Sequence, residues 1–92
     1  MIKSFADKNT HALWQGQLPS QFAPFSKVAL RKLDMLNAAI ELTDLLVPPG
    51  NRLEALKDKR KGQHSIRIND QWRICFVWSN GEADQVEIVD YH

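Results

Sequence analysis

Apolar residues follow two different rhythms along this chain, a helical one in the first half and a strand-like one in the second. Between residues 26 and 47 they recur every three or four positions, which predicts one long amphipathic helix. Ser26 is expected to cap this helix, and Pro48-Pro49-Gly50 to end it, because proline cannot continue the helical hydrogen-bond ladder. The predicted core stripe comprises Leu30, Leu33, Leu36, Ala39, Ile40 and Val47, widened by Leu42, Leu45 and Leu46.

A second, shorter helix is predicted near the amino terminus. Residues 1–5 resemble a short strand, Asp7 is a good N-cap, and the helix runs to Gln15. Gly16 suits the position after its last turn. Two prolines between Gly16 and Ser26 indicate a linker, because proline disfavours helix in the residue before it.

From residue 52 onward, apolar and polar residues alternate, which is typical of strands. Four strands are predicted, at residues 52–56, 63–68, 72–78 and 86–91. The connections are a charged turn at 57–62, Asn69-Asp70, and Ser79-Asn80-Gly81. In the third strand, Trp72, Ile74, Phe76 and Trp78 share one face, opposite Arg73, Cys75 and Val77.

Helices followed by strands predict an α+β fold in one domain spanning residues 1–92. Two N-terminal helices are expected to pack on one face of a small, mainly antiparallel β-sheet. The chain is 43% hydrophobic and 25% charged, which excludes a disordered protein. The lone Cys75 excludes an intrachain disulfide and is expected to be buried. With no apolar run near the roughly 18 residues of a membrane span and no signal peptide, we expect a cytoplasmic protein without a membrane partner.

Positive charge is concentrated in one segment. Residues 52–73 hold seven Lys or Arg against three Asp or Glu, whereas the rest of the chain holds five against eight. Such a segment favours a polyanion, although a solvated charged hairpin has the same composition.

Arg73 and the carboxyl-terminal residues are the candidates for chemistry. Arginine is rare inside a strand without a partner, so Arg73 either pairs with Asp90 or Glu54 or clamps a phosphate with its planar fork. The run Asp90-Tyr91-His92 offers groups that move or orient protons, although a frayed polar end is the simpler reading. Strand periodicity places Asp90 and His92 on one face and Tyr91 on the other. The three histidines are scattered, so neither a metal nor a cofactor is expected.

These residues resemble a known family. The segments Pro48-Pro49-Gly50-Asn51-Arg52-Leu53-Glu54-x-Leu56-Lys57, Asn69-Asp70-Gln71-Trp72-Arg73 and Val86-Glu87-Ile88-Val89-Asp90-Tyr91-His92 are similar to the HigB branch of the RelE toxin superfamily. The resemblance extends over essentially the whole chain. It implies the toxin of a type II toxin–antitoxin pair, a ribosome-dependent endoribonuclease that cuts messenger RNA in the ribosomal A site. It implies a HigA-like helix-turn-helix antitoxin as partner, and contact with operator DNA only through that complex.

The resemblance also implies roles for individual residues. RNA needs no metal for cleavage, because its own 2′-OH can attack the adjacent phosphate. Some relatives carry histidine where this chain has Glu54, so either Glu54 or His92 is the base, and Asp58 replaces a common glycine. The expected catalytic residues are Glu54, Lys57, Arg73, Asp90, Tyr91 and His92, and the expected RNA-binding residues are Arg52, Lys59, Arg60, Lys61 and Arg67.

Two other functions fit the same sequence. A ParE-like toxin would share the fold and inhibit DNA gyrase without catalysis, so it would need no acid–base cluster. A plain RNA-binding module would need exposed aromatic rings for stacking, whereas Trp72, Phe76 and Trp78 are expected in the core.

Overall fold

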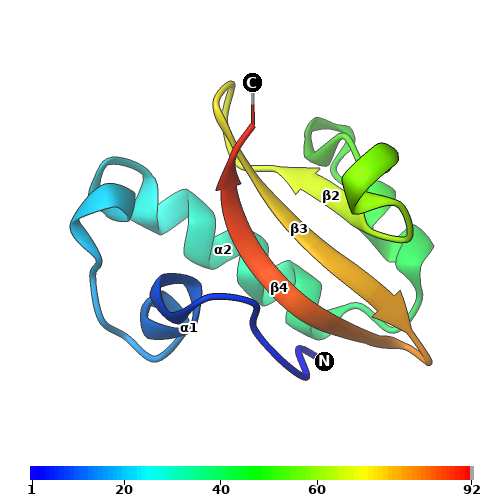
Figure 1. Ribbon diagram of the computed structural model, residues 1–92, viewed down its shortest axis with the longest axis horizontal. Coiled ribbons are helices and arrows are strands. Elements are labelled where there is room, and N and C mark those ends of the chain that lie inside the picture. The colour runs from blue at the N-terminus through cyan, green and yellow to red at the C-terminus, as the bar shows by residue number, and fades with distance from the viewer. Residues whose placement is uncertain (92) are drawn as a thin grey trace.

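An antiparallel sheet in the order β1-β2-β3-β4 forms the centre of the molecule (Figure 1). The computed structural model describes residues 1–91, so the predicted role of His92 lies outside the described residues. The strands are β1 (Glu54–Ala55), β2 (His64–Arg67), β3 (Trp72–Ser79) and β4 (Glu82–Asp90), and the α-helices are α1 (Lys8–Trp14) and α2 (Ser26–Ala38). Short 3₁₀ helices connect them: η1 (Ser20–Phe25), η2 (Leu42–Leu46), η3 (Pro49–Asn51) and η4 (Asp58–Arg60). The predicted α+β class and antiparallel sheet are confirmed.

The core lies between α2 and one face of the sheet, with α2 passing behind the strands in Figure 1. Leu33 and Leu36 of α2 and Ile74 and Phe76 of β3 are completely buried there. Each such side chain contributes about 1.5–3 kcal/mol through removal from water. Because Trp72 and Trp78 also pack against this cluster, the predicted apolar face of β3 is confirmed.

The long helix ends earlier than the periodicity predicts. It stops at Ala38 instead of continuing to residue 47, and Ser26 is its first residue while Phe25 occupies the N-cap position. The cause is a new helix start, because the Asp44 carboxylate accepts hydrogen bonds from the backbone amides of Ile40 and Glu41, each at 3.0 Å. This capping box opens η2 and turns three of the predicted core residues outward, leaving Ile40 78%, Leu46 53% and Val47 73% exposed.

The N-terminal segment closes the β4 edge of the sheet. Instead of a full strand, it forms two isolated parallel bridges, in which Ile2 pairs with Ala83 and Phe5 pairs with Val86. Asp7 caps α1 as predicted, accepting a hydrogen bond from the Thr10 amide at 3.2 Å. The Thr10 hydroxyl in turn accepts from the backbone amide of Ile88 at 2.9 Å. The prediction that both helices lie on one face is not confirmed, because α1 contacts the β4 edge as well as α2.

The last two strands are longer than expected and the first is shorter. Strand β4 begins directly after the Asn80-Gly81 turn, although Glu82 to Gln85 are polar enough to suggest a loop. Pairing with β3 on one side and with the N-terminal segment on the other keeps these polar residues in the sheet. The predicted first strand is reduced to residues 54–55, followed by one more hydrogen bond from the Leu56 amide to the Gln63 carbonyl at 2.9 Å. Before it, Arg52 adopts a left-handed conformation with φ of +46°, which delays the start of the strand. Among the described residues, no helix has the length and hydropathy to span a membrane.

Candidate functional site

The sheet face turned away from α2, called here the polar face, carries the predicted catalytic side chains of Glu54 and Arg73. Strand register sets Glu54 opposite Ser65, Ser65 opposite Cys75, and Cys75 opposite Glu87, so these four form one row across all strands. The next row places Arg67 opposite Arg73. Because side chains alternate along a strand, the residues between these point into the core.

Arg73 is held by three internal acceptors. Its Nε donates to the Ser65 hydroxyl at 2.8 Å, its Nη2 donates to the Arg52 carbonyl at 2.6 Å, and its Nη1 lies 3.6 Å from Glu54 Oε1. The Arg73 side chain is only 13% exposed, whereas that of Glu54 is 49% exposed. Of the two ion-pair partners that the sequence offered, the structure therefore shows Glu54. The polar face has a buried guanidinium beside an accessible carboxylate.

Tyr91 separates two small pockets next to this ion pair. Its ring lies over Arg73, with 5.8 Å between the guanidinium carbon and the ring centroid, and its backbone amide donates to the Gln71 carbonyl at 2.7 Å. The first pocket, of about 240 Å³, is lined by Arg52, Arg67, Asn69, Asp70, Arg73 and Tyr91. The second, of about 220 Å³, is lined by Glu54, Ala55, Leu56, Lys57, Asp58 and Tyr91.

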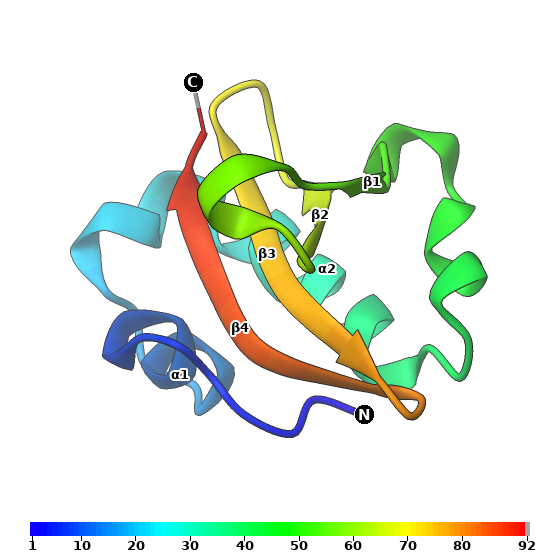
Figure 2. The same ribbon diagram turned by 45° about the vertical axis from the view of Figure 1, so that its right-hand side comes forward.

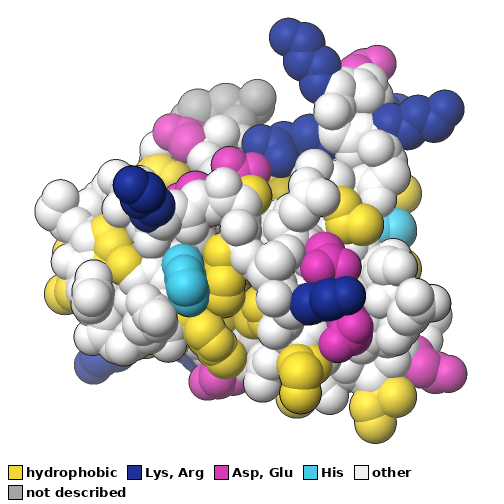
Figure 3. Space-filling model, turned by 60° about the horizontal axis from the view of Figure 1, so that its bottom comes forward, with side chains coloured by type: hydrophobic (Ala, Val, Ile, Leu, Met, Phe, Trp, Pro, Cys, Tyr) yellow, Lys and Arg dark blue, Asp and Glu magenta, His cyan; other side chains and the backbone are white. Residues whose placement is uncertain are grey.

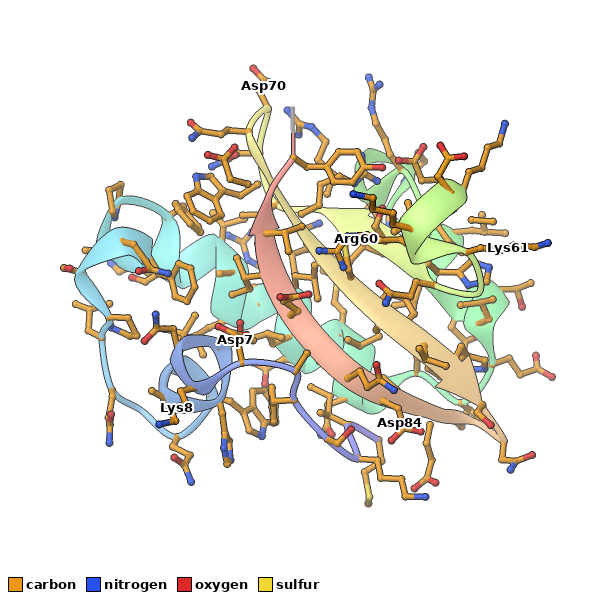
Figure 4. All side chains as sticks on the ribbon, in the orientation of Figure 1. Asp7, Lys8, Arg60, Lys61, Asp70 and Asp84 are labelled. Carbon is orange, nitrogen blue, oxygen red and sulfur yellow. The ribbon has the colours of Figure 1, made fainter. Side chains whose placement is uncertain are left out.

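The basic loop between β1 and β2 folds over the polar face, where Figure 2 shows it in front of the strands. Arg60 fastens it by donating to Glu87 Oε1 on β4 at 3.2 Å and to Gln63 Oε1 at 3.1 Å. In Figure 4, Arg60 accordingly lies over the sheet while Lys61 points away from it. Arg60 is thus engaged inside the protein, and its predicted contact with RNA stays a prediction. The same loop carries Lys57 to the second pocket.

The remaining basic residues differ in their accessibility. Lys59 and Lys61 are exposed on the loop, whereas Arg67 forms an ion pair with Asp70, which lies at the tip of the β2–β3 hairpin in Figure 4. Seen from below in Figure 3, several Lys and Arg side chains project from the upper rim, while much of the face toward the viewer is apolar or uncharged. The loop itself carries Lys57, Lys59, Arg60 and Lys61, four of the twelve Lys and Arg residues of the chain.

Asp90 lies on the opposite side of β4 from this cluster. It pairs in register with Trp72, and its Oδ2 accepts from Gln71 Nε2 at 3.0 Å. Within the described part of the chain, the lining of the two pockets does not include it. Its predicted orienting role stays a prediction. The side chains of Asp90 and Tyr91 lie on opposite sides of the sheet, as the strand periodicity predicts.

Cys75 lies in the centre of the polar row and is completely buried, as expected from its apolar strand. Burial raises the pKa of its thiol above the ordinary value, because a thiolate would lose its hydration there. The thiol is therefore the form present at neutral pH, and Cys75 fills space below the charged groups.

The structure adds residues that the sequence did not single out. Ser65 and the Arg52 carbonyl hold Arg73, and Glu87 holds the loop through Arg60. Ser65 has no signal of this role in the sequence: the predicted two-residue turn at Asn69-Asp70 would set Ile66 opposite Arg73 and Ser65 on the other face, whereas the observed register sets Arg67 opposite Arg73. The carbonyl has no signal either, because it depends on the left-handed backbone of Arg52.

Solved structures share the fold of this chain. The YoeB–YefM complex from Staphylococcus aureus matches with a TM-score of 0.63 at 18% identity, covering 100% of this chain and 98% of that one. The YoeB dimer from the same organism matches with a TM-score of 0.62 at 19% identity, covering 99% and 97%. At these identities the likeness shows the fold alone, which is that of the RelE-like toxins.

Sequence comparison narrows the class to a family. The model of the family described as RelE-like toxin of type II toxin–antitoxin system HigB matches residues 2–92, and the chain belongs to this family. It is 39% identical over 85 residues to Toxin HigB-1 of Vibrio cholerae serotype O1, covering 90% of each chain. It is 31% identical over 98 residues to Endoribonuclease HigB of Proteus vulgaris, covering 100% of each. The predicted resemblance is confirmed.

Proposed function

We propose that this toxin is a ribosome-dependent endoribonuclease that cleaves messenger RNA in the A site and thereby stops translation and growth. The observation that carries the proposal is the pocket shared by Glu54, Lys57 and Tyr91 beside the Arg73 guanidinium. A base, a cation and a phenol line this small pocket and a second cation, Arg73, lies beside it, which matches what cleavage of a phosphodiester requires. The Proteus vulgaris relative, named as an endoribonuclease, supports the same reaction class.

The proposed reaction uses the RNA's own 2′-OH and no metal. A base removes the 2′ proton, O2′ bonds to phosphorus, and the bond from phosphorus to O5′ breaks. The products are a 2′,3′-cyclic phosphate and a 5′-OH, with the leaving oxygen taking a proton from an acid. Positioned acids and bases each contribute about 10²–10⁴-fold in rate, and stabilisation of the phosphorane charge contributes a similar amount.

The proposed roles combine the family resemblance with the positions of the described residues. Arg73 and Lys57 face the phosphate, and Glu54, which is half exposed next to Arg73, removes the 2′ proton unless His92 does so. Tyr91 or His92 protonates the leaving oxygen. Asp90 orients a neighbouring group. The exposed Lys59 and Lys61, with Arg52, Arg60 and Arg67, hold messenger or ribosomal RNA, whose backbone attracts such a cluster.

The proposed partner is a HigA-like antitoxin with a helix-turn-helix. The solved complex of YoeB with YefM supports an antitoxin as partner for a toxin of this fold. Operator DNA would then be reached through the antitoxin, and the toxin alone would act on cytoplasmic ribosomes.

Cleavage can be tested with purified toxin and ribosomes programmed with a labelled messenger. We expect cuts at the A-site codon, products ending in 2′,3′-cyclic phosphate, and no comparable cutting of the naked messenger. A messenger with a single 2′-deoxy nucleotide at the cut site should resist cleavage, because it lacks the nucleophile. The Arg73→Ala variant serves as the inactive control.

Two results would contradict the proposal. Cutting of the 2′-deoxy messenger at the normal rate would indicate an activated water instead of the 2′-OH. Intact messenger together with inhibited DNA supercoiling by gyrase would indicate the ParE-like function.

A further inference from the structure

Arg73 is surrounded in a way that fixes the plane of its guanidinium. A guanidinium donates only within its own plane, so two bonds to fixed acceptors determine where its remaining donors point. The Ser65 hydroxyl at 2.8 Å from Nε and the Arg52 carbonyl at 2.6 Å from Nη2 are such acceptors. The remaining nitrogen, Nη1, then faces Glu54, which lines the second pocket, while Arg73 itself lines the first.

Ser65 is the less obvious of these two acceptors. It lies in β2 between Glu54 on β1 and Cys75 on β3, and its side chain is completely buried. A buried hydroxyl costs free energy unless it is hydrogen-bonded, and a bond to a charged donor is stronger than a neutral one. Its position in the strand also keeps it rigid, unlike an acceptor on a loop.

We propose that Ser65 is a positioning residue for cleavage, acting through Arg73. This inference rests on the proposed endoribonuclease function. Ser65 holds Nε so that the outer edge of the guanidinium faces the phosphate between the two pockets. Being buried, it touches no RNA. Its loss would leave Arg73 charged and present but free to rotate away from Ser65.

The main test compares Ser65→Ala with the parent under single-turnover conditions on saturating ribosomes. We expect cleavage to slow by about tenfold, the size of one charge-assisted hydrogen bond expressed in the transition state, with ribosome affinity unchanged. Ser65→Thr keeps the hydroxyl and should restore the rate. Ser65→Cys keeps the volume with a weaker acceptor and should give an intermediate rate.

A double-mutant cycle separates positioning from a general effect on the fold. Arg73→Lys keeps the charge but has no Nε donor, so adding Ser65→Ala to it should cause no further loss. An equal loss in both backgrounds, or no loss from Ser65→Ala in the parent, would overturn the inference.

A second readout does not depend on cleavage. In the ¹⁵N spectrum of the parent, the Arg73 Nε–H signal should be protected from exchange with water, and in Ser65→Ala it should exchange faster. If the parent cleaves no RNA but the signal behaves in this way, the proposed function fails while the Ser65 contact stands. An Arg73 signal unchanged by Ser65→Ala would overturn the contact itself.

Discussion

The two faces of strand β3 have different roles in this small protein. On the core face, Ile74 and Phe76 are completely buried among the apolar residues of α2 and the other strands. On the polar face, Cys75 lies in a row with Ser65 and Arg73 lies in the next row with Arg67, and Glu54 of β1 and Glu87 of β4 lie beside them. Neighbours in sequence therefore have opposite roles. A sheet with one apolar face and one polar face can therefore hold a charged site and still contribute to the core.

The largest effect is expected on the core face. Phe76→Ala should lower the free energy of unfolding by about 3–5 kcal/mol, because it leaves a cavity between the sheet and α2. Such a loss is a large part of the stability of a domain this size. Urea denaturation followed by circular dichroism measures it. A loss below about 1 kcal/mol would show that the core does not depend on this face.

Arg73→Ala should lower the cleavage rate and leave the fold intact. We expect cleavage of ribosome-bound messenger to fall by about 10²–10³-fold, because the phosphorane loses its main cation. The variant should remain folded, since Glu54 is half exposed to water and the loss of the one bond to the buried Ser65 hydroxyl costs only about 1–3 kcal/mol. The cleavage rate and the melting temperature of this variant are both measured. A large fall in melting temperature together with slow cleavage would show that Arg73 stabilises the fold as the core face does.

The Arg60–Glu87 pair tests whether the basic loop must be held against the polar face for cleavage. Both side chains are about one-third exposed, so the pair should contribute only about 0.2–1 kcal/mol to stability. Arg60→Glu and Glu87→Arg should each release the loop and slow cleavage, because Lys57 is then no longer held at its pocket. The double exchange should recover much of the rate. If it is as slow as the single variants, the contact does not position the loop.

Arg52 offers a matched pair of variants. Its φ of +46° is unfavourable for any side chain with a Cβ atom but not for glycine. Arg52→Gly should therefore be up to about 1 kcal/mol more stable than Arg52→Ala. Both lack the guanidinium, so both should bind RNA equally weakly in a filter or anisotropy assay. Different RNA affinities would show that the carbonyl contact to Arg73, and not the side chain, governs binding.

The smallest effect concerns the capping box that ends the long helix early. Hydrogen bonds from the amides of Glu41 and Ile40 hold the pKa of Asp44 below its ordinary value of 3.8. Its contribution is therefore present above that pH and is lost as the pH falls through the lower, folded-state pKa. Asp44→Asn should melt slightly below the parent at pH 7. The difference should disappear in strong acid, and a difference that persists there would exclude the carboxylate as its cause.

The sequence predicts the elements better than their ends. Asp7 is recognisable as a cap, and the alternation in β3 identifies its core face. The early end of α2 is harder to predict, because Leu42 and Leu45 keep the helical spacing. They belong to η2, a separate short helix that begins at Leu42. The sequence signal that distinguishes two separate helices from one long helix is the pair Glu41 and Asp44, which forms a capping box among apolar residues.

For the site, the resemblance supplies residue types and the structure supplies their neighbours. Glu54, Lys57, Arg73 and Tyr91 are brought together as the motif implies. The bond between Arg60 and Glu87 could not be predicted, because it joins a loop to a strand 27 residues away. Periodicity records which face a residue occupies, but not which residue of another element lies above it.

The closure of the β4 edge has a consequence for folding. The bond between Thr10 and Ile88 spans 78 residues, and the bond between Ser4 and Gln85 spans 81, so both join segments far apart along the chain. Contacts of such long range require a large loop to close and form slowly. Until they form, β4 presents an unpaired edge to which another chain can add. Once these contacts have formed, residues 2–6 cover the β4 edge, so that another chain can no longer add to it in the folded protein.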